Sequence, residues 1–139
     1  MRTKRRSLIA VLLLNMITLG FYQIYWYFIT KTEMNTLNSR NYQVPFFLWF
    51  FIPIINIWWF WRFAKAIEVT TKGEVNRWSA FLAPFVIALA VGIFLGAAPY
   101  TMVTDSLSSI SFWLRYGFIN LLVLLPIFYF QSNLNRFAR

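Results

Sequence analysis

A few polar side chains lie inside otherwise apolar runs of this sequence, and they are the residues most able to bind or conduct a solute. They are Asn15, Thr18, Gln23, Asn56 and Asn120. A buried amide needs a hydrogen-bonding partner. We expect hydrogen bonds between helices. The alternative is a polar path for an ion or small solute, which requires Asn15, Asn56 and Asn120 to line one cavity.

The sequence offers little for catalysis. It contains no Cys and no His, so it has no thiolate nucleophile, no imidazole base and none of the usual ligands of zinc, haem or iron–sulfur clusters. Its four carboxylates are predicted at or beyond helix ends, where none is placed to activate a hydroxyl nucleophile. We therefore expect a non-enzymatic protein with no metal and no cofactor. The carboxylates are Glu33, Glu68, Glu74 and Asp105.

The composition indicates a membrane protein. Of the 139 residues, 60% are hydrophobic and 12% are charged, more apolar surface than a small soluble core can bury. The net charge of +9 comes from basic residues at the ends of apolar runs, which is typical of topology determinants and not of a nucleic-acid-binding face. We predict an all-α, polytopic membrane helical bundle, with membrane lipids as partners and no nucleic acid.

Four apolar runs predict about four transmembrane helices in one domain. They cover residues 8–30, 44–61, 79–98 and 112–131, and each is long enough, or nearly so, to cross a bilayer. Pro53 and Pro126 are expected to kink their helices. Between the second and third runs, the first half of residues 62–78 is expected to form a short amphipathic helix at the cytoplasmic face that ends at Gly73. The alternative for this segment is a solvated loop with a helical start.

The first run allows other interpretations. Its basic start followed by an apolar stretch resembles a secretory signal, but hydrophobicity resumes after Gly20 and favours a retained membrane helix. Gly20 also permits a re-entrant hairpin that returns residues 31–43 to the cytoplasm. With the other runs spanning, that hairpin leaves three spans and places residues 62–78 outside, against the distribution of charge.

The distribution of basic residues predicts the orientation, because Lys and Arg resist translocation. Four spans with both ends inside place ten basic residues on the cytoplasmic side and three outside. The outer three are Lys31, Arg40 and Arg115. The inner ten are Arg2, Lys4, Arg5, Arg6, Arg62, Lys65, Lys72, Arg77, Arg136 and Arg139.

Two patterns suggest interaction surfaces. Ala88, Gly92 and Gly96 recur every four residues, so they share one helix face that a neighbouring helix can approach closely. Aromatic and basic residues also gather at two predicted helix ends, which is typical of interfacial belts and, more specifically, of a site for lipid. These residues are Tyr22, Tyr25, Trp26, Trp58, Trp59, Trp61, Arg62 and Lys65.

The first half of the chain resembles a known family. Residues 17–35 read ITLGFYQIYWYFITKTEMN after the basic Arg5 and Arg6, and residues 58–73 read WWFWRFAKAIEVTTKG. Over about residues 5–75 this is similar to the bacterial membrane-protein family catalogued as domain of unknown function 4234. Gln23 stands where the family often has Gly. The resemblance implies a multi-pass protein of the bacterial cytoplasmic membrane and implies no established activity.

Three functions fit these observations. The first is a small non-enzymatic membrane protein that acts by association, as an accessory subunit, a homo-oligomer or a membrane-protective factor. The second is a minimal oligomeric channel or transporter that uses the intramembrane amides. The third is a lipid-binding protein that uses the segment from Trp58 to Lys65. We expect the first.

Overall fold

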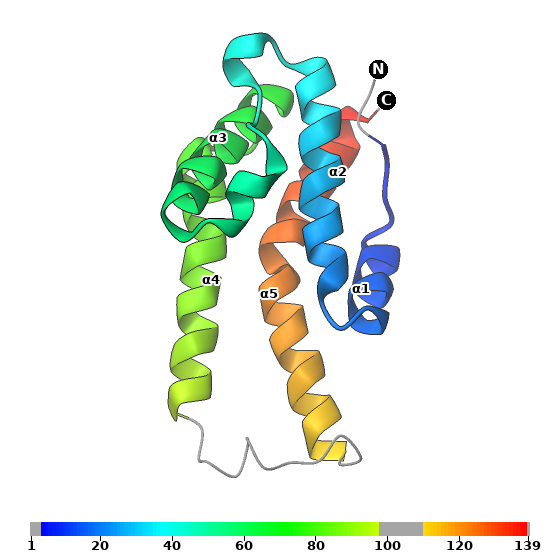
Figure 1. Ribbon diagram of the computed structural model, residues 1–139. Helices are drawn as coiled ribbons and strands as arrows, with labels where there is room; N and C mark the ends of the chain where they lie inside the picture. Colours follow the sequence, from blue (N-terminus) through cyan, green and yellow to red (C-terminus); the bar gives the residue numbers. More distant parts are fainter. Residues whose placement is uncertain (1–3, 98–109, 139) are drawn as a thin grey trace.

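The computed structural model describes residues 4–97 and 110–138, and this part of the chain is all-α, with no strand. Its elements, in chain order, are α1 (Leu8–Ile17), α2 (Phe21–Leu37), the short 3-10 helices η1 (Arg40–Tyr42) and η2 (Phe47–Phe51), α3 (Pro53–Thr70), α4 (Arg77–Ala97) and α5 (Ile110–Phe137). The long helices α4 and α5 extend beyond the others at the end away from the two termini (Figure 1).

The first apolar run forms two helices and not the expected single helix over residues 8–30. α1 ends at Ile17, and Leu19 and Gly20 take positive φ values of 51° and 94°, a conformation that suits glycine and strains leucine. The hydroxyl of Thr18 donates to Leu14 O and accepts from Tyr22 N, so it joins the end of α1 to the start of α2. The chain therefore reverses at Gly20, as in the hairpin alternative (Figure 1).

The second apolar run is not one helix over residues 44–61 either. Its first part forms η2, and the chain then reverses direction at Pro53, in the first turn of α3. Proline is well tolerated there, because its φ already suits a helix and the N–H group that it lacks would have no partner within the helix. Pro53 therefore starts a helix and does not kink one. The side chain of Asn56 donates to Phe50 O and links the two arms of this second hairpin.

The remaining elements follow the expected pattern more closely. The first part of residues 62–78 continues α3 to Thr70, and the chain then turns through Lys72 and Gly73, both at positive φ. The third run lies in α4, and residue 98 of that run lies outside the described residues. The fourth run lies in α5, which contains Pro126.

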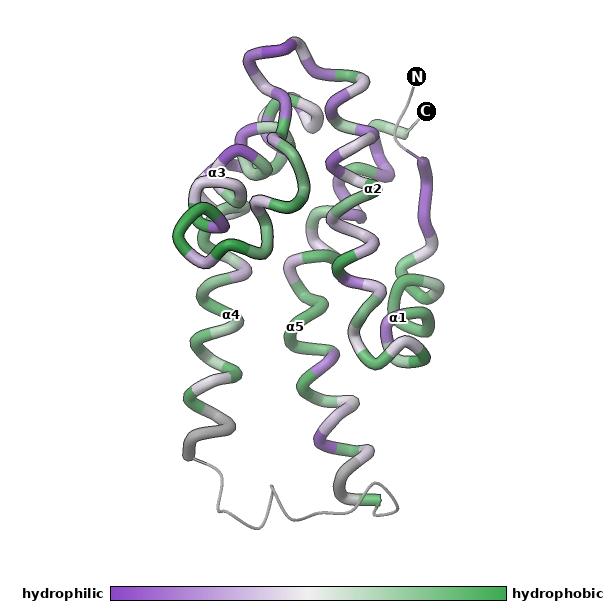
Figure 2. The backbone as a smooth tube through the Cα atoms, viewed as in Figure 1, coloured by the Kyte–Doolittle hydropathy of each residue, from purple (hydrophilic) through white to green (hydrophobic). Residues whose placement is uncertain are grey.

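Residues 31–43 lie at the same end of the molecule as both termini, and not at the opposite end as four spans require. Arg6 is ion-paired with Glu33 of α2 at 2.5 Å, and its backbone N–H donates to Asn135 of α5 at 3.0 Å. Asn38 donates to Ala66 O of α3 at 3.1 Å. Hydrophilic residues gather at this end, which we call the polar end, and the rest of the molecule is mostly apolar (Figure 2).

An aromatic cluster holds the two hairpins together near the polar end. Trp59 stacks on Phe63 with ring centroids 5.3 Å apart, and the edge of Tyr27 meets Phe63 at 5.2 Å. Trp26 stacks on Phe130 of α5 at 6.5 Å. Trp26, Trp59 and Phe130 are fully buried, and such ring pairs add to the stabilisation that burial of their area provides.

Candidate functional site: a cavity below the two hairpins

The two hairpins and the two long helices together form the walls of a partly open cavity. Its volume is about 400 Å³, within the usual range for ligand pockets. Five elements contribute to its walls, so it exists only in the folded chain. Its lining residues are Gln23 and Tyr27 of α2, Phe50 of η2, Phe60 of α3, Pro84, Ile87, Ala88, Val91 and Gly92 of α4, and Val123 and Pro126 of α5.

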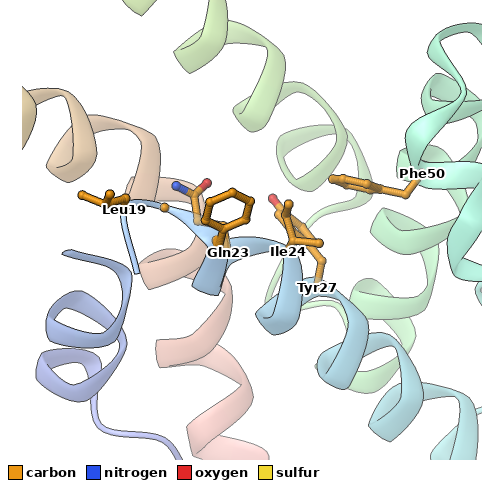
Figure 3. A pocket seen from close by; sticks show the side chains of 7 residues that line it. Leu19, Gln23, Ile24, Tyr27 and Phe50 are labelled. Atoms are coloured by element: carbon orange, nitrogen blue, oxygen red, sulfur yellow. The ribbon is translucent and has the colours of Figure 1, made fainter. Parts of the chain in front are cut away.

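A smaller pocket of about 270 Å³ adjoins this cavity beside the first turn. The two share Gln23, Tyr27 and Phe50. The rest of the smaller pocket is lined by Leu19, Gly20, Phe21 and Ile24. Figure 3 shows the amide of Gln23 and the hydroxyl end of Tyr27 directed to the same side of α2, with Phe50 across from Tyr27. Within the described residues, neither the Gln23 amide nor the Tyr27 hydroxyl has a hydrogen-bond partner.

The predicted helix-packing face lines this cavity and does not pack against another helix. Ala88 and Gly92 are exposed, and a Cβ added at Gly92 would meet no atom within 4 Å. Gly96 lies in the last turn of α4, where side-chain surroundings are not described. The chain therefore leaves the described part of its small-residue face open.

The three asparagines that the sequence predicts to lie within the membrane do not converge on one path. Asn15 of α1 donates to Asn120 of α5 at 2.8 Å, and both are buried. This is the interhelical hydrogen bond expected of buried amides. Asn56 instead bonds Phe50 O within the second hairpin. The geometry therefore favours a structural role for the three and gives the channel hypothesis no support.

The aromatic residues selected from the sequence fall into two groups. Trp26 and Trp59 belong to the buried core, whereas Tyr25 and Trp58 are each 51% exposed. Tyr22 lies beside Tyr25, with ring centroids 5.7 Å apart, and Trp61 packs against Trp78 at 5.0 Å.

The basic residues next to these aromatics already have partners. Arg62 donates to Gln43 O at 2.8 Å, and Lys65 lies 5.1 Å above the ring of Tyr42. The segment from Trp58 to Lys65 is therefore not a continuous open surface.

A polar network at the polar end was missed by the sequence analysis. Gln131 Oε1 accepts from Trp26 Nε1 at 2.8 Å and from Arg6 at 3.4 Å, and Gln131 Nε2 donates to Asn135 at 2.7 Å. The carboxylate of Glu33 completes the network by pairing with Arg6. The spacing of Gln131 and Asn135 on one helix face was the only signal, since their partners lie more than a hundred residues away.

The cavity itself was also missed, apart from Gln23 and the small residues. Tyr27 and Phe50 each belong to a long run of aromatic residues. Their spacing in the sequence does not indicate whether they line a cavity, lie in the core or face lipid. Pro84 and Pro126 carried a clearer signal. Proline lacks an N–H group, so the carbonyl groups of Ala80 and Leu122 receive no helical hydrogen bond.

Helix length gives limited support for membrane association. Among the described residues, one helix, Trp113–Phe137, combines sufficient length with sufficient apolar character to cross a bilayer, with a mean hydropathy of 1.5. Two shorter apolar stretches are Leu8–Ile17, which is α1, and Arg77–Ile93, which is the part of α4 whose side chains are described. A single such helix is weak support, because a buried helix of a soluble protein can meet the same criteria.

Comparison with known proteins confirms the family resemblance. Residues 6–69, just under half of the chain, match the family described as Domain of unknown function (DUF4234). This region ends inside α3, so it covers the two hairpins and excludes both long helices. Comparisons with curated proteins and with solved structures give no match.

Proposed function

We propose that the chain is a small non-enzymatic integral membrane protein of the bacterial cytoplasmic membrane that acts by association with another molecule inside the bilayer. In this proposal α4 and α5 cross the membrane, and the two hairpins enter it from the cytoplasmic side without crossing. Both termini then lie in the cytoplasm. This arrangement takes the place of the four-span bundle and keeps its orientation.

The lengths of the long helices and of α1 support two crossings and a first hairpin whose α1 arm spans half the bilayer. α4 has 21 residues, which corresponds to about 32 Å and matches the hydrocarbon thickness of a bilayer. α1 has 10 residues, or about 15 Å, half of that thickness. Every described α-helix also exposes large apolar side chains, such as Ile9, Phe21, Ile54, Val86 and Leu114, which suits a lipid environment.

The distribution of charge supports the same arrangement more strongly than it supports four spans. With residues 31–43 at the polar end, Lys31 and Arg40 join the other basic residues there. Partial burial lowers the pKa of the Lys31 ammonium group, in keeping with a position near the apolar boundary. Of the basic residues in the described ranges, only Arg115 in the first turns of α5 lies toward the opposite end. The positive-inside rule is therefore satisfied with one exception.

The observation that carries the association proposal is the open cavity. A chain that buried its own small-residue face would have no need of a partner there. Here Ala88 and Gly92 line a space of about 400 Å³ that no side chain of the described residues fills. Apolar side chains without neighbouring atoms lack the dispersion energy that close contacts provide. A molecule bound at this face would supply those contacts and would therefore stabilise the fold.

Site-specific photo-crosslinking in native membranes tests this proposal. A diazirine amino acid at position 88 faces the cavity, and the same residue at position 90, which is exposed and does not line the cavity, is the matched control. We expect position 88 to give one dominant adduct, and position 90 a mixture of bulk lipids. The same mixture from both positions would contradict association. Release of the chain by alkaline carbonate would contradict membrane insertion itself.

A further inference from the structure

We propose that the cavity binds a neutral, lipid-like molecule: an apolar chain carrying one hydroxyl or carbonyl group, which Tyr27 and Gln23 hydrogen-bond. The inference rests on the proposed function, because it assigns the chemistry of the associated molecule. Its starting point is the pair of unpartnered polar groups at the end of an otherwise apolar space (Figure 3).

The first step concerns hydrogen bonding. Tyr27 is 7% exposed, and its hydroxyl lies at the cavity wall with no partner among the described residues. The amide of Gln23 also lines the space without a partner among these residues, and its side chain is half-buried. Leaving such groups unsatisfied in an apolar region is costly. One oxygen atom of a ligand can accept from the Tyr27 hydroxyl and the Gln23 amide together, and an alcohol can also donate to Gln23 Oε1.

The second step concerns charge. No Lys, Arg, Asp or Glu lies among the cavity-lining residues. A phosphate, carboxylate or ammonium group placed there would be a buried charge without a counter-ion, which is strongly unfavourable. The group held by Tyr27 and Gln23 is therefore neutral.

The third step concerns shape. The rest of the wall is apolar and includes Phe50 of η2, Phe60 of α3, and Val91 beside the small residues of α4. The volume of about 400 Å³ is in the range of pockets that hold small ligands. A slender chain fits this space. Because Ala88 and Gly92 are both exposed and part of the wall, such a chain can enter sideways from the lipid.

A labelling experiment on the full chain in lipid nanodiscs tests the inference. The probes are a diazirine-bearing long-chain alcohol, the matching hydrocarbon without oxygen, and a diazirine-bearing phospholipid. We expect saturable labelling of α4 and η2 peptides by the alcohol. The apparent affinity for the hydrocarbon should be at least about fivefold lower, because the hydrogen bonds from Tyr27 and Gln23 are lost and each contributes about that factor. Saturable labelling by the phospholipid that the alcohol cannot displace would assign the site to the ester-bearing chain of a bilayer lipid.

Three variants provide the controls. Gly92→Leu adds a side chain where the structure has open space, and we expect it to abolish saturable labelling, whereas Ala90→Leu on another face of the same helix leaves labelling unchanged. Tyr27→Phe should remove most of the preference for alcohol over hydrocarbon.

Non-saturable labelling, or labelling that Gly92→Leu does not change, would overturn the inference. So would equal labelling by alcohol and hydrocarbon. If labelling fails in one of these ways but carbonate extraction of the same samples leaves the chain in the membrane, the cavity assignment has failed and membrane insertion has not.

Discussion

The side-chain amide of Asn15 donates a hydrogen bond to Oδ1 of Asn120 across 2.8 Å, and this buried bond joins the first hairpin to α5. The two residues are 105 positions apart in the sequence. Near them Gly117 approaches Met16, with 3.8 Å between a Cβ added at Gly117 and the terminal methyl of Met16. At that distance the added Cβ would make an ordinary van der Waals contact, so alanine would also fit at position 117.

Breaking this pair on one side should destabilise the protein more than removing it entirely. Asn120→Leu leaves the Asn15 amide buried without a partner, which costs about 1–2 kcal/mol. The double variant Asn15→Leu/Asn120→Leu should recover most of that loss, because no polar group is then left unsatisfied. Thermal unfolding in detergent measures both. A double variant less stable than either single variant would contradict the assigned bond.

The turn at Gly20 should tolerate no side chain. Its φ of 94° lies in the left-handed region, so Gly20→Ala should lower the free energy of unfolding by about 1–2 kcal/mol. Gly92→Ala is the matched control, since it meets open space at an ordinary φ. Tryptophan fluorescence during thermal denaturation in detergent reports both. Equal stability of Gly20→Ala and the parent chain would argue against a reversal of the chain at this position.

The ion pair between Arg6 and Glu33 should matter more than an exposed one. Its side chains are 14% and 13% exposed, whereas those of the pair between Arg136 and Glu74 are 70% and 50% exposed. Glu33→Ala leaves Arg6 partly buried without its counter-ion and should cost about 2 kcal/mol. Glu74→Ala should cost less than about 0.5 kcal/mol. Chemical denaturation in detergent compares them, and similar losses would contradict the structural role of the network at the polar end.

The helical class and the two long helices were predictable from the sequence, because α4 and α5 coincide with long apolar runs. The two hairpins were harder to predict. Gly20 and Pro53 interrupt apolar runs that are long enough in total for a helix to cross a bilayer. The length of a run does not show whether such a residue ends the helix or only kinks it. Lys31 and Arg40 were the sequence evidence against four spans, because four spans place both of these basic residues outside the cytoplasm.

The site could be predicted only in part, for physical reasons. Ala88 and Gly92 do share a face, but spacing on one helix says nothing about whether another element covers that face. Trp26 and Trp59 lie among aromatic neighbours on every side of their helices, so periodicity could not identify them as core residues. The hydrogen bond from Trp26 to Gln131 depends on contacts between opposite ends of the chain.

Labelling of a single cysteine at position 39 tests the central claim, the return of residues 31–43 to the cytoplasmic side, most directly. The chain has no native Cys, and Ser39 is exposed at the polar end. With a membrane-impermeant maleimide, Ser39→Cys should react from the same side as Glu74→Cys, between α3 and α4. When the maleimide is added on the side of the membrane where Ser106→Cys, between α4 and α5, reacts, Ser39→Cys should not be labelled. Labelling of Ser39→Cys from the same side as Ser106→Cys would contradict the two-hairpin arrangement and restore four spans.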